Sequence, residues 1–491
     1  MRRLPDSPWL RGALAILAGA AGVFCFAPFA AFWLAFPVWL GFFLLLREAP
    51  TTRGGFLLGF CFGSGFFLAG VSWVYVSLSV FGGLPPWLAG IATFLFCSVL
   101  ALFPALAGAA FKRWQPGEAV AQALLFGALW MLAEWLRGWV FTGFPWLALG
   151  YSQAPPSPLA GFAPVVGVYG VSLIVATLAA LLLRWRIGVP ILVIALAAGF
   201  GLRQLAWTTP AGEPVSVALV QGNVPQELKF RPENFIPTLL LYRDLVADNP
   251  AQITVLPETA VPVLFEQLPP EFVAEMKRLA ARQGGDLILG AASGGGGTYR
   301  NSAITLGNAP MQSYSKSHLV PFGEFIPPGF GWFLDLVHIP MADFTRGTVP
   351  QPPFVLGNQR VAANICYEDA FGEEIIRALP EATLLVNLSN TAWFGRSLAQ
   401  PQHLQMARLR ALETGRPMLR ATNTGMTAVV TPQGAVQAVL PPFTRGVLKA
   451  EVRGYQGMTP YARLGNLPAL LLAVGAGVLA LALAHRKRRQ K

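Results

Sequence analysis

The sequence has little charge. Lys, Arg, Asp and Glu make up 12% of its 491 residues, whereas hydrophobic residues make up 54%. Soluble domains usually carry about 25% charged residues, so one soluble domain does not account for the whole chain. The shortage is uneven, because residues 10–207 are apolar runs broken by short polar joints, while residues 208–458 have the composition of a globular protein.

Histidine and cysteine are also scarce, with four of each. His318, His338 and His403 lack the spacing typical of metal ligands, so the sequence predicts no zinc site and no cofactor. Three cysteines lie within apolar runs, where a small thiol is unremarkable. Cys366 is the only cysteine of residues 207–466. That region therefore has no intradomain disulfide, and we expect its free thiol to be buried or used.

The apolar runs approach the roughly 20 residues that a helix needs to cross a hydrocarbon core. We do not expect the first run to be a cleaved signal peptide, because further runs follow and no small-x-small site closes it. The eight spans expected from these runs lie near 10–28, 30–46, 55–80, 86–111, 118–136, 160–183, 188–206 and 467–484.

Basic residues fall on one side of these spans. Fourteen Lys and Arg residues lie at the two ends and in alternate joints, whereas the other joints, near 29, 81–85 and 137–159, hold only Arg137. Positively charged joints stay in the cytoplasm. Membrane orientation thus explains the net charge of +12 better than nucleic-acid binding does.

The orientation and composition together predict three parts. A membrane domain of seven transmembrane helices is expected at 1–206, a periplasmic domain at 207–466, and an eighth transmembrane helix with a basic cytoplasmic tail at 467–491. Both termini are then cytoplasmic, and the protein is expected in the inner membrane of a bacterium.

The exported region alternates strands with amphipathic helices, which favours layered α/β packing. Helices are predicted at 235–248, 270–284 and 403–415, and a hairpin at 427–440 about Pro432 to Gly434. Further strands are predicted at 214–222, 252–258, 286–293, 299–307, 359–368, 382–390 and 417–425.

Three residues at or near the ends of strand-like strings carry chemistry. Glu258 follows ITVLP, Lys316 lies in YSKSHLVPFGE, and Cys366 ends VAANIC. A carboxylate there can act as a general base, a cysteine attacks as a thiolate, and a lysine stabilises an oxyanion. Taken singly, Glu258 and Lys316 also fit surface charges, Cys366 fits a core thiol, and Asn390 and Trp393 fit a turn with an aromatic plug.

In combination, the strings LPETA, KSHLVPFGEF and ICYED resemble the Glu-Lys-Cys triad of the nitrilase (carbon–nitrogen hydrolase) superfamily. With the eight spans, and with QGNVPQELKF, SNTAWFG, RATNTGMTAVV and TPYARLGN, the chain resembles bacterial apolipoprotein N-acyltransferases. The resemblance implies a nitrilase-like α-β-β-α sandwich attached to a polytopic α-helical membrane bundle.

Carried over position by position, the resemblance implies that Cys366 is the nucleophile, Glu258 the general base and acid, and Lys316 the stabiliser of the charged intermediate. Phe230 stands where the family often has tryptophan, which keeps an aromatic ring but removes the indole N–H donor. The other positions that match parts of the family's site are Glu324, Tyr367, Glu368, Asn390 and Trp393.

The resemblance also implies a reaction. An acyl chain passes from a bilayer phospholipid, expected to be phosphatidylethanolamine, through a cysteine thioester to the α-amine of a diacylglyceryl-cysteine apolipoprotein. This ping-pong exchange is the last step of bacterial lipoprotein maturation. Two alternatives remain: a membrane-tethered amidase with the same triad, or a transporter with an external domain. The spans carry few charges for a transporter, among which Glu134 stands out.

The segment 325–344 is rich in Pro, Gly and aromatic residues. It fits a loop packed on its own domain, or a lid that dips into the outer leaflet, where aromatic side chains are favoured. In the second interpretation, Phe330, Trp332 and Phe333 contact the lipid.

Overall fold

The structure of the protein is a computed structural model that describes residues 7–329, 331 and 343–489. The described residues divide into two compact units. The helical unit comprises Met1–Tyr75, Pro86–Leu205 and Arg463–Lys491, and the sandwich unit comprises Val76–Pro85 and Ala206–Ala462.

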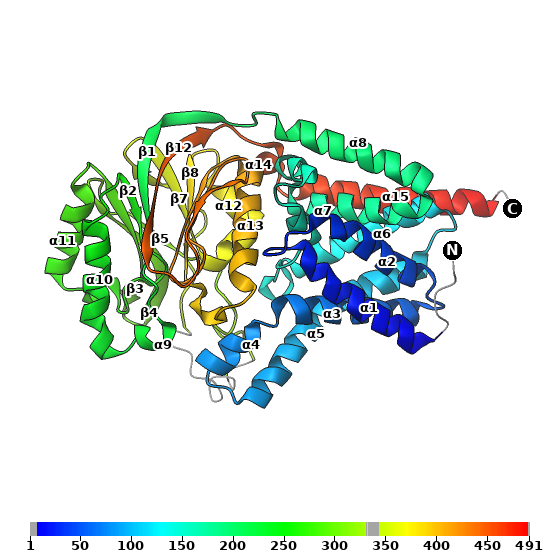
Figure 1. Ribbon diagram of the computed structural model, residues 1–491, viewed down its shortest axis with the longest axis horizontal. Coiled ribbons are helices and arrows are strands. Elements are labelled where there is room, and N and C mark those ends of the chain that lie inside the picture. The colour runs from blue at the N-terminus through cyan, green and yellow to red at the C-terminus, as the bar shows by residue number, and fades with distance from the viewer. Residues whose placement is uncertain (1–6, 330, 332–342, 490–491) are drawn as a thin grey trace. The chain divides into compact units, whose positions relative to one another are not determined.

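The helical unit consists of long apolar helices (Figure 1). Six stretches of the described chain are long and apolar enough to cross a membrane, and one of them, Pro158–Arg203, contains two helices. The stretch Phe32–Arg47 is apolar but shorter. Every predicted span therefore has a helix at its position: α1 (Pro8–Gly22), α2 (Ala35–Arg47), α3 (Thr52–Val71), α5 (Pro86–Trp114), α6 (Ala119–Arg137), α7 (Ala163–Leu181), α8 (Trp185–Arg203) and α15 (Leu467–Arg489).

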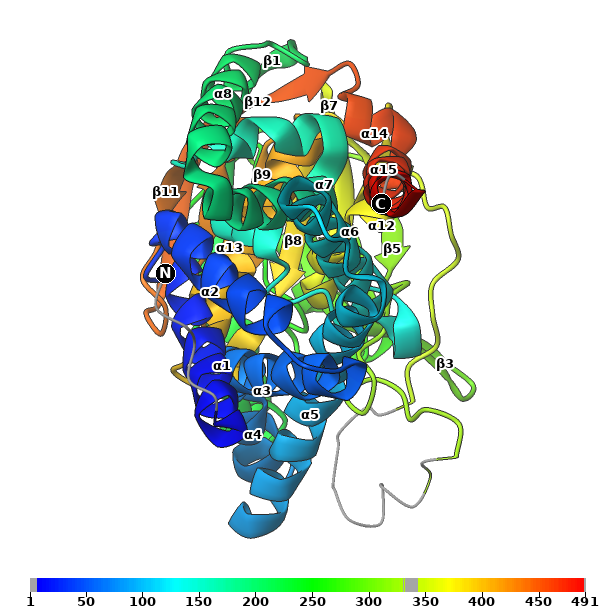
Figure 2. The same ribbon diagram turned by 90° about the vertical axis from the view of Figure 1, so that its right-hand side faces the viewer.

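Glycines let α3 lie very close to its neighbours α1 and α5, between which it runs in both views (Figure 1, Figure 2). A Cβ atom added at Gly65 would lie 2.0 Å from the carbonyl oxygen of Ile16 in α1, and one at Gly59 would lie 2.3 Å from that of Pro104 in α5. Small residues at helix contacts are typical of membrane bundles, where close backbone packing drives association.

Glu134, the charged residue that stood out in the predicted spans, is held by hydrogen bonds within the helical unit. It is buried in α6 and accepts hydrogen bonds from Trp130 Nε1 and from the backbone N–H of Leu149, both at 2.8 Å. One turn on, Arg137 donates to the carbonyl oxygen of Trp146 at 2.6 Å. The pair thus satisfies backbone groups of the irregular chain between α6 and α7, which explains its presence without a transport pathway.

The chain after α3 differs from the predicted span at 55–80. Helix α3 ends at Val71, and after α4 (Val74–Val76) the chain forms a π-helical turn, Ser77–Phe81, within the sandwich unit. The physical reason is a contact with Trp393. Ser77 Oγ donates to the carbonyl oxygen of Trp393 at 2.8 Å, and the rings of Phe81 and Trp393 meet edge to face at 5.7 Å.

The sandwich unit is built on two six-stranded sheets, in the orders β12-β1-β2-β3-β4-β5 and β11-β10-β9-β8-β7-β6. Strands β1, β2 and β3 pair in parallel, as do β7, β8 and β9. The first sheet comprises β1 (Thr209–Gln221), β2 (Ile253–Val255), β3 (Asp286–Gly295), β4 (Thr298–Gly307), β5 (Ser313–Ser315) and β12 (Gly446–Gln456). The second comprises β6 (Phe354–Leu356), β7 (Gln359–Ile365), β8 (Leu384–Ser389), β9 (Met418–Thr422), β10 (Ala428–Val430) and β11 (Val436–Val439).

Helices cover the outer faces of both sheets, which gives four layers in the order α-β-β-α (Figure 1). Alternate strand residues such as Leu219 and Leu388 meet between the sheets. Residues of the opposite phase, such as Val220 and Leu385, pack against the helices. The helices α10 (Phe235–Ala247) and α11 (Pro270–Ala281) cover the first sheet, and α12 (Gly372–Ile375) and α13 (Ala399–Thr414) cover the second. The short helix α9 (Gln226–Lys229) also lies in this unit, and α14 (Pro460–Leu464) begins in it and ends in the helical unit.

Candidate active site

Cys366 occupies a sharp turn directly after β7. Its φ angle is +54°, a left-handed conformation that non-glycine residues rarely adopt, and a 3-10 turn, Cys366–Ala370, follows at once. Strained backbone of this kind persists where the surroundings hold it and often marks a functional site. The turn presents the half-buried side chain of Cys366 at the carboxyl end of the parallel strands β7 and β8.

The first sheet supplies two more of the predicted residues from its own strand ends. Glu258 follows β2 and precedes Thr259, whose φ angle is +48°. Lys316 follows β5, and its backbone N–H donates to the carbonyl oxygen of Asn301 on β4 at 2.8 Å. Side chains from the two sheets therefore converge, and the charges of Glu258 and Lys316 act on the Cys366 thiol.

Lys316 lies between two carboxylates. Its Nζ is 2.9 and 2.8 Å from the two oxygens of Glu324 and 3.5 Å from Oε1 of Glu258, and the side chain is 1% exposed. Burial opposes the charged ammonium, but the charges of Glu324 and Glu258 outweigh it and raise the pKa of Lys316 above its ordinary value. Lys316 is therefore a cation throughout the physiological pH range.

Asn301 joins the two carboxylates and was not predicted. Its Nδ2 donates to Oε1 of Glu258 and to Oε1 of Glu324, each at 2.8 Å. Asn301 is 3% exposed and lies on the same face of β4 as Ala303, which packs in the core between the sheets. An amide on the inward phase of the strand string YRNSAITLG is the signal that could have identified it.

Glu258 is held by further neighbours. Its Oε2 accepts the backbone N–H of Asn390 at 2.8 Å, and the Asn390 side chain donates to Gln226 Oε1 at 2.8 Å. Lys229, 1% exposed, donates to the carbonyl oxygen of Glu258 at 3.3 Å. Burial lowers the pKa of Lys229 to about 8, although the charge of Glu258 opposes this. The string QGNVPQELKF thus touches the site through Gln226 and Lys229, two residues that sequence reasoning did not single out.

The Cys366 thiol is protonated at rest. Burial raises the pKa of the thiol well above its ordinary value, and the charges of Glu258 and Glu324 add to the effect. The charge of Lys316 and a backbone hydrogen bond from Asn390 oppose it without cancelling it. The thiol proton must therefore be taken up as the sulfur attacks, which requires a base at the thiol.

Glu368 ties the turn at Cys366 to the loop that carries Lys316. One oxygen accepts the backbone N–H groups of Ser317 and His318 at 2.7 and 3.1 Å, and the other accepts that of Ile365 at 2.7 Å. The hydroxyl of Tyr314 donates to both oxygens at 3.0 and 2.9 Å. Glu368 therefore acts as an acceptor linking two segments far apart in sequence.

The structure places the remaining predicted residues as follows. Tyr367 is buried, with its ring edge to face with His318 and Phe371 at 5.8 and 5.1 Å. Trp393 contacts Ser77 and Phe81 as described above. Phe230 follows Lys229 directly at the end of α9. The predicted lid residues Phe330, Trp332 and Phe333 lie outside the described residues.

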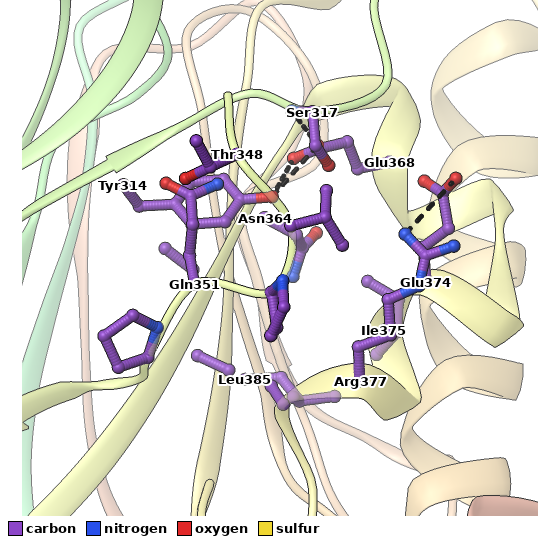
Figure 3. A pocket seen from close by; sticks show the side chains of 16 residues that line it. Tyr314, Ser317, Thr348, Gln351, Asn364, Glu368, Glu374, Ile375, Arg377 and Leu385 are labelled. Carbon is purple, nitrogen blue, oxygen red and sulfur yellow. Dashed lines mark hydrogen bonds and ion pairs between the residues drawn. The ribbon is translucent and has the colours of Figure 1, made fainter. Parts of the chain in front are cut away.

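Glu368 also lines a small cavity of about 50 Å³ (Figure 3). Tyr314 and Ser317 point toward Glu368 on one side of it, and Glu374 faces Arg377 on the other. None of Cys366, Glu258 and Lys316 lines it, so the cavity is not where an acyl chain would meet the nucleophile. Within the described residues, no group of three or more His, Cys, Asp or Glu side chains is arranged to hold a metal ion.

Two family models match this chain. Residues 18–181 match the family model of the apolipoprotein N-acyltransferase N-terminal domain, and residues 216–460 match that of the carbon-nitrogen hydrolases. An amidase structure from Nesterenkonia sp. is similar over 50% of this chain and 92% of that chain, with 19% identity and a TM-score of 0.37.

Two curated relatives match almost the full length. The chain is 48% identical to the apolipoprotein N-acyltransferase of Ralstonia nicotianae, over 97% of this chain and 93% of that protein. It is also 48% identical to that of Nitrosomonas europaea, over 96% of this chain and 97% of that protein. Similarity of this extent, over both the helical and the sandwich parts, shows that the chain belongs to the apolipoprotein N-acyltransferase family.

Proposed function

We propose that the chain transfers an acyl chain from phosphatidylethanolamine to the N-terminal α-amine of diacylglyceryl-cysteine apolipoproteins, through a thioester on Cys366. The observation that carries the proposal is the strained turn that presents Cys366 to the buried carboxylate–lysine cluster of Glu258, Lys316 and Glu324. The relatives' names support the acceptor, since they are apolipoprotein N-acyltransferases.

In the first half of the reaction, Glu258 takes the thiol proton as Cys366 Sγ attacks the ester carbonyl of the phospholipid. The carbonyl oxygen becomes an oxyanion that the ammonium of Lys316 stabilises. The intermediate then collapses and its bond to the lipid alkoxide breaks. Glu258 returns the proton to that oxygen, lysophospholipid leaves, and an acyl thioester remains on Cys366.

In the second half, the α-amine of the apolipoprotein attacks the thioester. Glu258 accepts a proton from the amine nitrogen, the C–S bond breaks, and the proton passes to the departing sulfur. The products are an amide and the free thiol of Cys366. Because an amide is more stable than an oxygen ester, the overall ester-to-amide exchange is driven forward. Water must be kept from the thioester, which a site at the bilayer surface favours.

Acyl transfer from purified protein and radiolabelled phosphatidylethanolamine tests this proposal. We expect label on Cys366 that hydroxylamine removes, and transfer of that label to a diacylated lipopeptide. Absence of label combined with amide hydrolysis would favour the membrane-tethered amidase, and absence of label combined with solute uptake would favour the transporter. Either result would overturn the proposed acyl transfer from phospholipid.

We further propose that the sandwich unit is periplasmic and that both termini are cytoplasmic, in the inner membrane. The support is the distribution of fourteen basic residues on one side of the spans and Arg137 alone on the other. A Glu271→Cys variant places a thiol on an exposed position of α11. A membrane-impermeant maleimide should label this thiol in cells whose outer membrane is permeabilised, beyond the labelling of the parent protein. Labelling only after lysis of the inner membrane would reverse the orientation.

A further inference from the structure

A buried polar cluster lies next to the backbone carbonyl of Cys366. It consists of Asp369 from that turn, His403 from α13 and Arg420 from β9, with exposed fractions of 0%, 1% and 1%. None of the three takes part in the proposed reaction. Burying a charged pair and a histidine together costs free energy unless their polar atoms form hydrogen bonds.

The three side chains form a closed ring. Arg420 Nη1 donates to Asp369 Oδ2 at 2.5 Å, Arg420 Nη2 donates to His403 Nδ1 at 2.6 Å, and His403 Nε2 lies 2.7 Å from Asp369 Oδ1. A guanidinium only donates, so His403 Nδ1 must be an acceptor and the ring proton must be on Nε2. The cluster thereby fixes both the tautomer and the orientation of His403.

The single Nε2–H group is shared between two acceptors: besides Asp369 Oδ1 at 2.7 Å, it faces the backbone carbonyl of Cys366 as a longer second partner. His403 Nε2 lies 3.2 Å from the carbonyl oxygen of Cys366, which also accepts a hydrogen bond from Asn387 Nδ2 at 3.0 Å. Asn387 in turn donates to Asn364 Oδ1 at 2.7 Å, so the second donor is itself held in place. Two oriented donors therefore meet at the carbonyl of Cys366, whose φ angle of +54° persists only where its surroundings hold it.

We propose that His403, oriented by Asp369 and Arg420, is a positioning residue for the nucleophile: its Nε2–H group holds the Cys366 carbonyl and so keeps the thiol directed toward Glu258 and Lys316. Burial and the charge of Arg420 lower the pKa of His403, which agrees with a neutral ring that donates through Nε2. The inference rests on the proposed role of Cys366 as nucleophile.

The test compares two amides at one position in the full-length protein. In His403→Gln, the amide nitrogen reaches the place of Nε2 and can still donate to the Cys366 carbonyl. In His403→Asn, the shorter amide reaches the place of Nδ1 and cannot. The rate of Cys366 alkylation by iodoacetamide, the rate of acyl-enzyme formation from phospholipid, the KM for phospholipid and the midpoint of thermal unfolding are measured for both variants.

We expect alkylation and acyl-enzyme formation at least about tenfold slower in His403→Asn than in His403→Gln, because small displacements of a reacting group can cost about 100-fold. KM should be unchanged. Glu413→Gln is the matched control, since it breaks a buried ion pair with Arg410 on the same helix, at 2.9 Å. Glu413→Gln should lower the unfolding midpoint yet keep the parent rate of alkylation.

Equal alkylation rates in the two amide variants, with lowered unfolding midpoints, would show that the cluster only stabilises the fold and would overturn the inference. Alkylation of Cys366 does not require acyl transfer. A parent protein that alkylates normally but forms no acyl-enzyme would therefore refute the proposed function separately. If His403→Asn does not fold, His403→Gln still decides the question, because an alkylation rate in the folded His403→Gln variant at least about tenfold below the parent rate contradicts its donor role.

Discussion

Replacement of Asn301 by leucine removes the amide that joins the carboxylates of Glu258 and Glu324. Leucine has the same branching at Cγ but no donor, so Glu258 Oε1 and Glu324 Oε1 each lose a hydrogen bond of 2.8 Å. A hydrogen bond to a charged group is worth about 1.5–3 kcal/mol. Glu258 would then be held by the N–H of Asn390 at 2.8 Å and by Lys316 at 3.5 Å.

The loss at Glu258 alone is therefore about 2 kcal/mol. If that contribution is needed to hold the base in place for the attack, acyl-enzyme formation should slow by about 30-fold. The assay is a single-turnover reaction with radiolabelled phosphatidylethanolamine, in which hydroxylamine-sensitive label on the protein is followed over time.

Ser302→Ala, one residue along β4, is the matched control. Its hydroxyl contacts the hydroxyls of Ser293 and Ser315 rather than the carboxylates, so acyl-enzyme formation should remain near the parent rate. An Asn301→Leu protein that is folded and forms acyl-enzyme at the parent rate would refute the view that the amide positions the base.

Four further substitutions, at three residues, address the reacting groups. Cys366→Ser should leave the fold intact and abolish acyl transfer, because the neighbours do not ionise a hydroxyl; near-normal turnover would end the thioester mechanism. Glu258→Gln should form no labelled acyl-enzyme, since no group then takes the thiol proton, and full labelling would identify another base. Lys316→Met should also remain unlabelled. Lys316→Arg should label poorly, because a planar guanidinium does not replace a compact ammonium between two carboxylates. Parent-level labelling of Lys316→Arg would contradict this geometry.

The layered fold was predictable because its strands and helices carry strong local patterns. Strands such as β3 and helices such as α11 were expected within a few residues of their observed bounds. The three-residue strands β5 and β6 were not, because their pairing partners define them rather than any local periodicity. The apolar sequence predicts a span that runs into the π-helical turn Ser77–Phe81. Local sequence does not indicate that this turn contacts Trp393, which lies far along the chain.

The site was predictable where a reactive residue ends a strand, as for Glu258, Lys316 and Cys366. Residues whose importance depends on pairing register were missed. Asn301 reaches two carboxylates only because β4 and β5 pair and bring Lys316 beside it. Likewise, the contact of His403 with the Cys366 carbonyl requires α13 to pack against the turn after β7. Such contacts are tertiary, and the only local sign among them is the polar amide of Asn301 at an inward-facing position of its strand.

The contact between Ser77 and Trp393 has a consequence for biosynthesis. The two residues are 316 positions apart in the chain, so the ribosome releases the π-helical turn long before its partner exists. The chain also passes between the two units four times, at Tyr75/Val76, Pro85/Pro86, Leu205/Ala206 and Ala462/Arg463. The sandwich unit thus includes a piece that is made early and is tied at both ends to apolar helices. Its assembly requires a contact between residues far apart in sequence, and such contacts slow folding. A fragment that begins at Ala206 would lack that piece from the outset.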